Sequence, residues 1–415
     1  MITGKQTDAV RERFARVAMR SAPAPMAVLD HGQGALVWDV DGKEYLDFLA
    51  GIAVNALGHA HPVLVEAVAA QAARLVHVSN YFTTPQAVAF AERLVRLTGF
   101  GPTGRVYPAN SGAEAIEAAL KLARRTGRPR ILAFEQAFHG RTMGALALTG
   151  KAALRAPFEP MVAGVEHLPT DLAALEAALG PDVAALVLEP IKGEAGVVPL
   201  PPGFLAEARR LTRAHGTLLI IDEIQTGAGR TGDWFAFQHE LGSDGYGTGD
   251  GTGDDMLPDA VVVAKGIGGG VPVGALVTRG VASELFTLGQ HGSTFGGNPL
   301  ATGVADAVLA EIERADLVGN AARRGEQMRR GILALESPLV TEVRGRGLLL
   351  GVGLAAPVAA RVVAEALDRG LIINAANDES IRLAPPLIIG DAEIERFLTV
   401  FAASLTVANL EAAIP

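Results

Sequence analysis

The stretch from residue 183 to residue 223, "VAALVLEPIKGEAGVVPLPPGFLAEARRLTRAHGTLLIIDE", decides the fold. It begins and ends with apolar runs, at 183–190 and 217–223, that have the length and composition of buried strands. Between them, residues 201–216 form a helical pattern that opens with proline and closes at Gly216, as helices prefer. A strand, a helix and a second strand in this order are typical of a parallel sheet covered on both faces.

The same alternation continues on both sides of this stretch. Further strand-like runs occupy 130–135 and 260–265, and a helical pattern occupies 112–127. We therefore expect an α/β fold with a large domain, whose mostly parallel central sheet is covered by helices, and a smaller α+β domain. The expected divisions are 1–60 for an N-terminal arm and part of the small domain, 61–305 for the large domain, and 306–415 for the rest of the small domain.

Two local patterns refine this expectation. The run "VDGK" at 40–43 has the composition of a hairpin turn, so its flanking strands are expected in the small domain. The segment "GSDGYGTGDGTGDDM" at 242–256 is rich in glycine and aspartate and has almost nothing to bury. We expect it to be a flexible surface insertion in the large domain.

Composition narrows the class of protein. The 415 residues are 49% hydrophobic and 20% charged, with a net charge of -9, so non-specific nucleic-acid binding is not expected. The chain has no cysteine, which excludes disulfides, thiolate metal sites and cysteine nucleophiles; no metal site is predicted. No apolar run approaches the ~18–20 residues of a membrane span. The charged N-terminal stretch also lacks the apolar core of a signal peptide. We therefore expect a cytoplasmic protein without membrane contact.

Three strand-like runs end in a charged residue: Glu189, Asp222 and Lys265. Ligands of open α/β sheets bind just beyond the carboxyl ends of the strands. One such charge could be a paired structural residue, but an acid and a lysine that each follow a solid apolar run could meet in one cleft. A lysine in apolar surroundings loses its proton readily and becomes a nucleophile toward carbonyl groups.

Two loops of small residues are candidates for binding phosphate. In "NSGAEAIEAALKLAR" (110–124), Ser111 and Gly112 precede a helix whose first amides could bind an anion. Glu114 also has capping-box spacing from Ser111, so a plain helix cap is the alternative. The loop "HGSTFGGNP" at 291–299 offers the hydroxyls of Ser293 and Thr294 and could equally be a simple turn.

Taken together, the ordered blocks resemble those of the class III, fold-type I pyridoxal-phosphate aminotransferases, and most closely those that act on N2-acetylornithine. The resemblance covers nearly the whole chain. It rests on "GIAVNALGHAHP", "NSGAEAIEAALKLAR", "FHGRTMGALALTG", "LEPIKGEAGVVPLPPGFL", "LLIIDEIQTGAGRTG", "AKGIGGGVPVGA", "HGSTFGGNP", "VRGRGLLLG" and "IRLAPPLII".

The resemblance implies roles around pyridoxal 5'-phosphate. Lys265 would hold the cofactor covalently and shuttle the proton during catalysis, while Asp222 would keep the pyridine nitrogen protonated, which makes the ring an electron sink. The resemblance also implies a homodimer. The remaining cofactor residues would be Gln225 near the ring hydroxyl, Phe138 on the ring face, Ser111, Gly112 and Ala113 on the phosphate, and Thr294 reaching the phosphate of the neighbouring subunit.

The resemblance also implies two arginines for carboxylates. Arg141 would hold the distal carboxylate of either substrate, and Arg382 the near carboxylate of glutamate, both in bidentate geometry. Glu194 would cover Arg382 when acetylornithine occupies the site. Ser293 is a further predicted substrate-binding residue. The implied reaction moves the δ-amino group of N2-acetylornithine to 2-oxoglutarate, in arginine biosynthesis.

Some features depart from the family pattern or fit other classes. Ile116 stands where family members usually carry asparagine.

"GAGRTG" at 227–232 matches the dinucleotide pattern, but it begins five residues past Asp222 and no helix follows cleanly, which disfavours a dehydrogenase. A non-enzymatic binding protein would not need the pairing of Asp222 with Lys265, and a racemase or lyase would not need two arginines.

Other substrates within the family remain alternatives: ornithine, succinylornithine and 4-aminobutyrate. Ornithine-specific relatives typically carry a tyrosine near the stretch "FLAGIAVN", where this chain has Gly51 and Ile52. That difference favours a substrate whose α-nitrogen is blocked. The size of the acyl group is left open.

Overall fold

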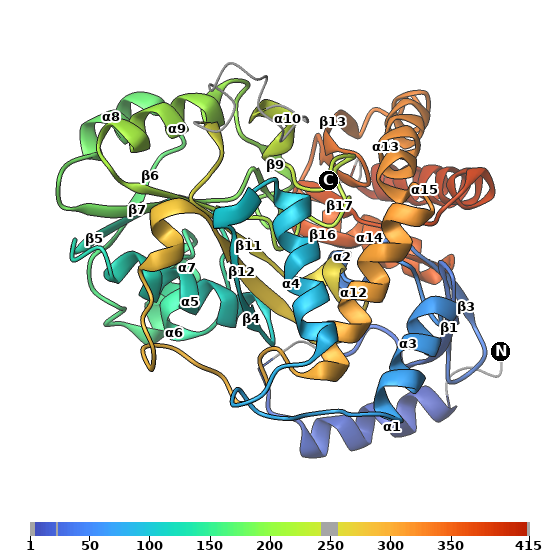
Figure 1. The fold of residues 1–415 in the computed structure, drawn as a ribbon. Coiled ribbons are helices and arrows are strands. Elements are labelled where there is room, and N and C mark those ends of the chain that lie inside the picture. The colour runs from blue at the N-terminus through green and yellow to red at the C-terminus, as the bar shows by residue number, and fades with distance from the viewer. Residues whose placement is uncertain (1–4, 22–23, 242–255, 413–415) are drawn as a thin grey trace.

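The central feature of the computed structural model, which describes residues 5–21, 24–241 and 256–412, is a seven-stranded sheet (Figure 1). Its order is β4-β12-β11-β10-β7-β5-β6, and β12 runs against the other six. The predicted α/β fold with a mostly parallel sheet is therefore confirmed. The strands are β4 (Arg105–Ala109), β5 (Arg130–Phe134), β6 (Val165–Leu168), β7 (Val183–Leu188), β10 (Leu218–Asp222), β11 (Ala260–Val263) and β12 (Gly274–Thr278).

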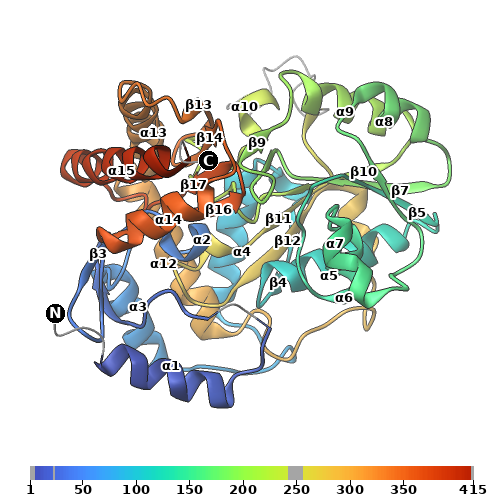
Figure 2. The same cartoon turned by 180° about the vertical axis from the view of Figure 1, so that it is seen from behind.

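Helices cover both faces of this sheet (Figures 1 and 2). Along β10, Leu219 and Ile221 belong to the apolar cluster that includes α9, whereas Leu218 and Ile220 belong to the one that includes α5. This two-residue alternation explains why the strands read as continuous apolar runs. The helices of this region are α3 (Pro62–Ala72), α4 (Pro85–Thr98), α5 (Gly112–Arg124), α6 (Met143–Leu148), α7 (Ala152–Arg155), α8 (Leu172–Ala178), α9 (Phe204–Ala214), α10 (Gln238–Leu241) and α12 (Pro299–Arg314).

The ends of the chain come together in one of two smaller sheets. In the sheet β1-β2-β3-β15, the N-terminal strand β3 pairs in parallel with β15 from the C-terminal part; the second has the order β13-β14-β17-β16. The predicted hairpin at 40–43 joins β2 to β3. The elements are α1 (Lys5–Val17), β1 (Leu29–Gln33), β2 (Leu36–Asp39), β3 (Glu44–Asp47), α2 (Ala50–Ala53), α13 (Leu317–Leu333), β13 (Val340–Arg346), β14 (Leu349–Leu354), α14 (Ala359–Asp368), β15 (Leu371–Ile372), β16 (Asn374–Asn377), β17 (Ser380–Leu383) and α15 (Asp391–Ala412).

The sheet places the three predicted strand-end charges at one edge. Glu189 directly follows β7, Asp222 is the last residue of β10, and Lys265 lies two residues past β11. Because these three strands are parallel neighbours in the sheet, their carboxyl ends meet at the same edge, as the sequence predicts. The short pair β8 (Ile191–Lys192) and β9 (Val198–Pro199) forms the loop just beyond β7.

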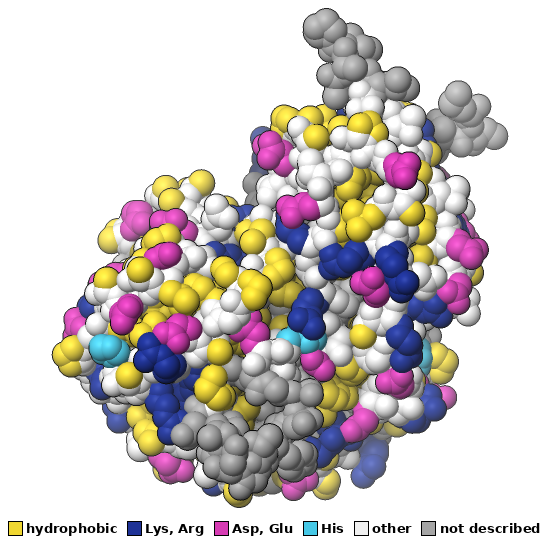
Figure 3. Space-filling view, turned by 90° about the horizontal axis from the view of Figure 1, so that it is seen from above, with side chains coloured by type: hydrophobic (Ala, Val, Ile, Leu, Met, Phe, Trp, Pro, Cys, Tyr) yellow, Lys and Arg dark blue, Asp and Glu magenta, His cyan; other side chains and the backbone are white. Residues whose placement is uncertain are grey.

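The surface offers no single dominant charge on the face seen from above, where acidic and basic side chains are interspersed (Figure 3). Across residues 5–21, 24–241 and 256–412, no helix is both long and apolar enough to cross a bilayer. The predicted flexible insertion at 242–256 lies, except for residue 256, outside the described residues.

Candidate active site

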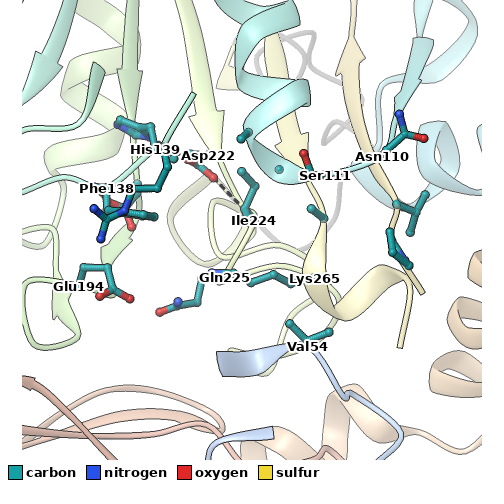
Figure 4. A pocket seen from close by; sticks show the side chains of 18 of the residues that line it. Val54, Asn110, Ser111, Phe138, His139, Glu194, Asp222, Ile224, Gln225 and Lys265 are labelled. Carbon is teal, nitrogen blue, oxygen red and sulfur yellow. Dashed lines mark hydrogen bonds and ion pairs between the residues drawn. The ribbon is translucent and has the colours of Figure 1, made fainter. Parts of the chain in front are cut away.

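A cavity of about 450 Å³ opens at the carboxyl edge of the sheet, where the strand-end charges meet. In the close view, Asn110 and Ser111 lie at one end and Phe138 and Glu194 at the other (Figure 4). The wall is assembled from loops distant in sequence, which only the sheet brings together. Nine predicted site residues line it: Ser111, Gly112, Ala113, Phe138, Arg141, Glu194, Asp222, Gln225 and Lys265.

Lys265 points into this cavity from a tight turn after β11. Its own backbone is left-handed, with φ of 47°, and Gly269 and Gly270 also have positive φ. Such strain in a non-glycine residue is typical of functional sites. Burial lowers the pKa of the Lys265 amine, an effect that Asp222 opposes and Arg382 assists. The amine is therefore easier to deprotonate than an exposed lysine, and the glycines let the chain turn beside it.

Asp222 is held by a histidine that the sequence analysis did not assign. His139 Nδ1 lies 2.7 Å from Asp222 Oδ2, and both side chains are buried. The amide of Ile224 donates to Asp222 Oδ1 at 3.0 Å. Burial opposes a charge on His139, but Asp222 outweighs it and raises the pKa of the imidazole. The only sequence signal for His139 was its position between Phe138 and Arg141, two residues already assigned to the site.

The start of α5 forms a close-packed cradle at one end of the cavity. Ser111 Oγ accepts from the Glu114 amide at 3.1 Å, as predicted for a cap. Glu114 departs from the capping-box pattern, since its carboxylate accepts from the Asn110 amide at 2.9 Å rather than from that of Ser111. A methyl group on Gly112 would lie 2.7 Å from the Ile224 side chain, which would have to shift to make room for a larger residue. Ile116, the departure from the family pattern, is fully buried in the apolar core behind the cradle.

Arg382 lies at the other end, with only 1% of its side chain exposed. Its guanidinium forms an ion pair with Glu194, its Nε donates to Asn374 Oδ1 at 3.0 Å, and it lies 3.4 Å from Gln225 Oε1. Burial opposes ionisation of Glu194, but Arg382 lowers the pKa of its carboxyl. Lys151 Nζ donates to the Glu194 carbonyl at 2.6 Å. The pair is thus held by its neighbours but stands beside open space.

Arg141 extends over Phe138, with its guanidinium carbon 5.6 Å from the ring centre. The side chain of Arg141 is exposed, and among the described residues it forms no ion pair. Nearby, Glu189 accepts from the Phe138 amide at 2.8 Å and from the Gly193 amide at 3.3 Å, and burial raises its pKa. Glu189 thus fixes the loop that carries Phe138, while Arg141 keeps a cation available at the mouth of the cavity.

Three predicted residues do not line this cavity: Arg382, which lies behind Glu194 and Gln225, and the hydroxyl residues Ser293 and Thr294. Ser293 Oγ accepts from Asn110 Nδ2 at 2.9 Å, so Ser293 lies one residue behind the wall. Thr294 is exposed and lines a separate hollow of about 250 Å³, next to the chain at 77–87. Within a single chain, the structure therefore leaves these two hydroxyls outside the site.

The motif "GAGRTG" has a structural role away from the cavity. Its Arg230 is buried and donates to the carbonyl oxygens of Leu348, at 3.3 Å, and Pro385. Burial lowers the pKa of Arg230 to about 9. The motif therefore ties the loop after β10 to the segments beside β14 and β17 instead of binding a dinucleotide.

The residues present fit pyridoxal phosphate. The cradle at the start of α5 suits its phosphate, the buried carboxylate of Asp222 suits its pyridine nitrogen, and the amine of Lys265 suits its aldehyde. Fold and cavity together define a pyridoxal-phosphate enzyme of fold type I.

Comparison with known proteins identifies the family. The family model described as "Aminotransferase class-III" matches residues 17–405. The acetylornithine aminotransferase of Mycobacterium leprae is 50% identical over 398 residues, which are 96% of this chain and 95% of the relative. The chain belongs to the class III aminotransferases, and it is a pyridoxal-phosphate-dependent enzyme.

Solved structures agree with this assignment. The N-acetylornithine aminotransferase of Stenotrophomonas maltophilia has a TM-score of 0.80 at 36% identity and covers 97% of this chain and 99% of its own. The ornithine aminotransferase of Toxoplasma gondii has a TM-score of 0.89 at 32% identity and covers 99% of this chain and 97% of its own. Relatives named for two different substrates thus share the fold, so the fold alone does not fix the substrate.

Proposed function

We propose that this enzyme moves the δ-amino group of N2-acetylornithine to 2-oxoglutarate, giving N-acetylglutamate semialdehyde and glutamate reversibly, in arginine biosynthesis. The observation that carries the proposal is the ion pair between the buried Arg382 and the partly exposed Glu194, beside a cavity that also holds the cation of Arg141. Arg141 is available to a substrate with a single carboxylate. Arg382, which Glu194 neutralises, becomes available as well when the substrate has two carboxylates. The similarity to acetylornithine aminotransferases supports the same assignment.

The chain's own groups account for the steps. Arg141 binds the carboxylate distant from the reacting amine in both substrates. In the donor half-reaction, Lys265 Nζ takes the proton from the carbon that bears the amine and would pass it to the cofactor; in the acceptor half-reaction, it would deliver a proton to the carbonyl carbon of 2-oxoglutarate. Asp222, oriented by His139, keeps a proton on the pyridine nitrogen. When bound, the cofactor supplies the electron sink that makes removal of that proton feasible.

Glu194 acts as the switch between the two substrates. An isolated buried guanidinium is costly, so Glu194 stays on Arg382 while acetylornithine, which has no carboxylate near its reacting amine, is bound. The near carboxylate of glutamate replaces Glu194 on Arg382 in the other half-reaction. The Glu194 side chain is 29% exposed. It can therefore swing away from Arg382 toward solvent when the carboxylate of glutamate arrives.

The Glu194→Ala variant is expected to lose discrimination. Its ratio of kcat/KM for N2-acetylornithine to kcat/KM for glutamate should fall by about tenfold or more, because an uncovered Arg382 favours the substrate with two carboxylates. Single-turnover rates of the two half-reactions measure this ratio. Glu313→Gln, which breaks an exposed pair with Arg96, is the control and should leave it unchanged. An unchanged ratio in Glu194→Ala contradicts the switch.

A panel of amine donors tests the substrate assignment. With 2-oxoglutarate as acceptor, glutamate formation should be fastest with N2-acetylornithine or N2-succinylornithine and slower with ornithine and 4-aminobutyrate. The stretch around Gly51 and Ile52 offers no hydroxyl for a free α-amine. A higher kcat/KM with ornithine than with either acylated donor would contradict the assignment.

We also propose a homodimer in which Thr294 completes the cofactor site of the partner subunit. Around the hollow that Thr294 lines, Tyr81, Phe82 and Phe295 are 93%, 71% and 61% exposed, an apolar area that a second copy would cover. A cytoplasmic location stays a prediction from composition.

A charge in this apolar area is expected to separate the subunits. Phe295→Asp should run as a monomer in light scattering after gel filtration and should retain less pyridoxal phosphate on dialysis, because Thr294 no longer reaches a partner. Leu333→Asp places a charge on an exposed apolar residue of α13 and serves as the control. A monomeric wild type, or a dimeric Phe295→Asp that keeps its cofactor, would contradict the arrangement.

A further inference from the structure

The turn α2 is strained, although none of its residues is assigned a part in amino transfer. Its four residues, Ala50–Ala53, all have positive φ, of 50°, 65°, 67° and 62°. Only one of them is glycine, and Ile52 is β-branched, the kind of residue that avoids this conformation most strongly. Consecutive left-handed residues persist only where the surroundings impose them.

Asp47, at the end of β3, supplies the constraint. Its Oδ1 accepts from the amides of Leu49 and Ala50, at 3.0 and 2.8 Å. Its Oδ2 lies 2.8 Å from His59 Nε2. Asp47 is 4% exposed, so water does not compete for these bonds. The carboxylate therefore holds the chain where it enters the left-handed turn, and His59 holds the carboxylate.

The turn lies between the segments that carry the chemistry. On one side, Val54 lines the cavity, and a methyl group on Gly266, the residue after Lys265, would lie 3.7 Å from the Ala53 carbonyl oxygen. On the other side, the Phe48 carbonyl accepts from the Ala384 amide at 2.8 Å, two residues past Arg382. The turn thus bridges the Lys265 loop and the strand of Arg382.

Further contacts join the loop that carries Glu194 to the turn at Ala50–Ala53. Ala53 packs in a small apolar cluster with Ile191 and Val197, which flank Glu194, and with Leu349 and Ala384. The Ala56 carbonyl accepts from the Leu387 amide at 2.8 Å, which ties the end of this segment to the chain beyond β17. Displacement of the turn would therefore shift Lys265, Arg382 and Glu194 relative to one another.

We propose that Asp47 is a positioning residue for transamination: by imposing the left-handed turn at Ala50–Ala53, it sets the spacing between Lys265 and Arg382. The inference rests on the proposed function only for the role of Arg382 toward glutamate. It assigns Asp47 no contact with substrate or cofactor.

The test compares three substitutions in the holoenzyme. Asp47→Ala removes both amide contacts, Asp47→Asn keeps an acceptor oxygen for them, and Asp47→Ala combined with Ala50→Gly makes the left-handed turn easier to adopt without Asp47. Glu336→Gly, which relieves a positive φ of 48° at an exposed residue elsewhere, replaces Ala50→Gly in the control double variant. The readouts are KM and kcat of the glutamate half-reaction and the hydrogen exchange of peptides within 48–56.

We expect Asp47→Ala to raise KM for glutamate about tenfold and to lower kcat about tenfold, which is the effect of a displacement of roughly 1 Å. Hydrogen exchange of the peptides within 48–56 should become faster. Asp47→Asn should stay within about threefold of wild type, because its oxygen still accepts from both amides. Ala50→Gly should restore a large part of both losses, and Glu336→Gly should restore neither.

Wild-type kinetics in Asp47→Ala, or equal rescue by Glu336→Gly, would overturn the proposal. If Asp47→Ala does not fold, Asp47→Glu, which keeps the charge but displaces its oxygens, should show the same pattern of losses; wild-type behaviour there would also overturn it. The glutamate half-reaction and the exchange report on the turn even if N2-acetylornithine is not the donor, so failure of the substrate assignment is distinguishable.

Discussion

Replacement of Lys265 by alanine is expected to lower kcat for amino transfer by about 10⁴-fold or more, because both covalent attachment and proton transfer depend on its amine. The variant should still fold, since the Lys265 side chain faces the cavity and its backbone turn is supported by the glycines that follow. It should also still bind pyridoxal phosphate at the cradle of α5, but without a covalent bond. Stopped-flow measurement of both half-reactions gives the loss.

Borohydride reduction of the wild-type holoenzyme, followed by peptide mapping, checks the attachment point. The pyridoxyl group should be found on Lys265. Lys192 is the internal control, because it is also a buried lysine close to the site, but its amine donates to the Glu135 carbonyl at 2.8 Å and to Thr170. A label on Lys192, or kcat in Lys265→Ala within tenfold of wild type, would contradict the role of Lys265.

Replacement of Asp222 by alanine is expected to lower kcat by about 10²–10³-fold, the effect of losing a preorganised charge at the reacting group. Without this carboxylate the pyridine nitrogen is no longer held protonated, and the cofactor becomes a weaker electron sink. The loss should appear in kcat for both half-reactions, because both require removal of a proton from the substrate carbon.

The neighbours of Asp222 provide graded comparisons. His139→Leu should have a smaller effect, of about tenfold, because it removes a hydrogen bond to Asp222 but leaves the charge. Asp259→Asn disturbs a carboxylate that pairs with Arg209 at 2.7 Å, just before β11 and away from the cavity, and should leave kcat unchanged. Comparable losses in Asp259→Asn and Asp222→Ala would indicate a general disturbance of the sheet.

The sequence predicted the sheet and the charged residues at its strand ends because both follow from local pattern. Apolar runs of strand length mark β7, β10 and β11, and parallel strands must deliver Glu189, Asp222 and Lys265 to one edge. The cradle at Ser111 was likewise marked by a helix start. Each of these features needs only a short stretch of sequence and a rule of topology.

Other parts of the site depend on contacts that local pattern does not carry. His139 reaches Asp222 across 83 positions of the chain, and Asn374 supports Arg382 from a neighbouring strand. The left-handed turn is less visible still, because three of its four residues are not glycine and the constraint comes from Asp47 and His59. Tertiary hydrogen bonds impose these conformations against local preference.

The measurement that tests the central claim most directly follows the nitrogen itself. N2-acetylornithine labelled with ¹⁵N at the δ-position is incubated with the holoenzyme and unlabelled 2-oxoglutarate. Direct transfer of the amino group should give ¹⁵N-glutamate and N-acetylglutamate semialdehyde in equal amounts, with no labelled ammonia. Release of the label as ammonia, or retention of the label on the donor while unlabelled glutamate forms, would contradict it.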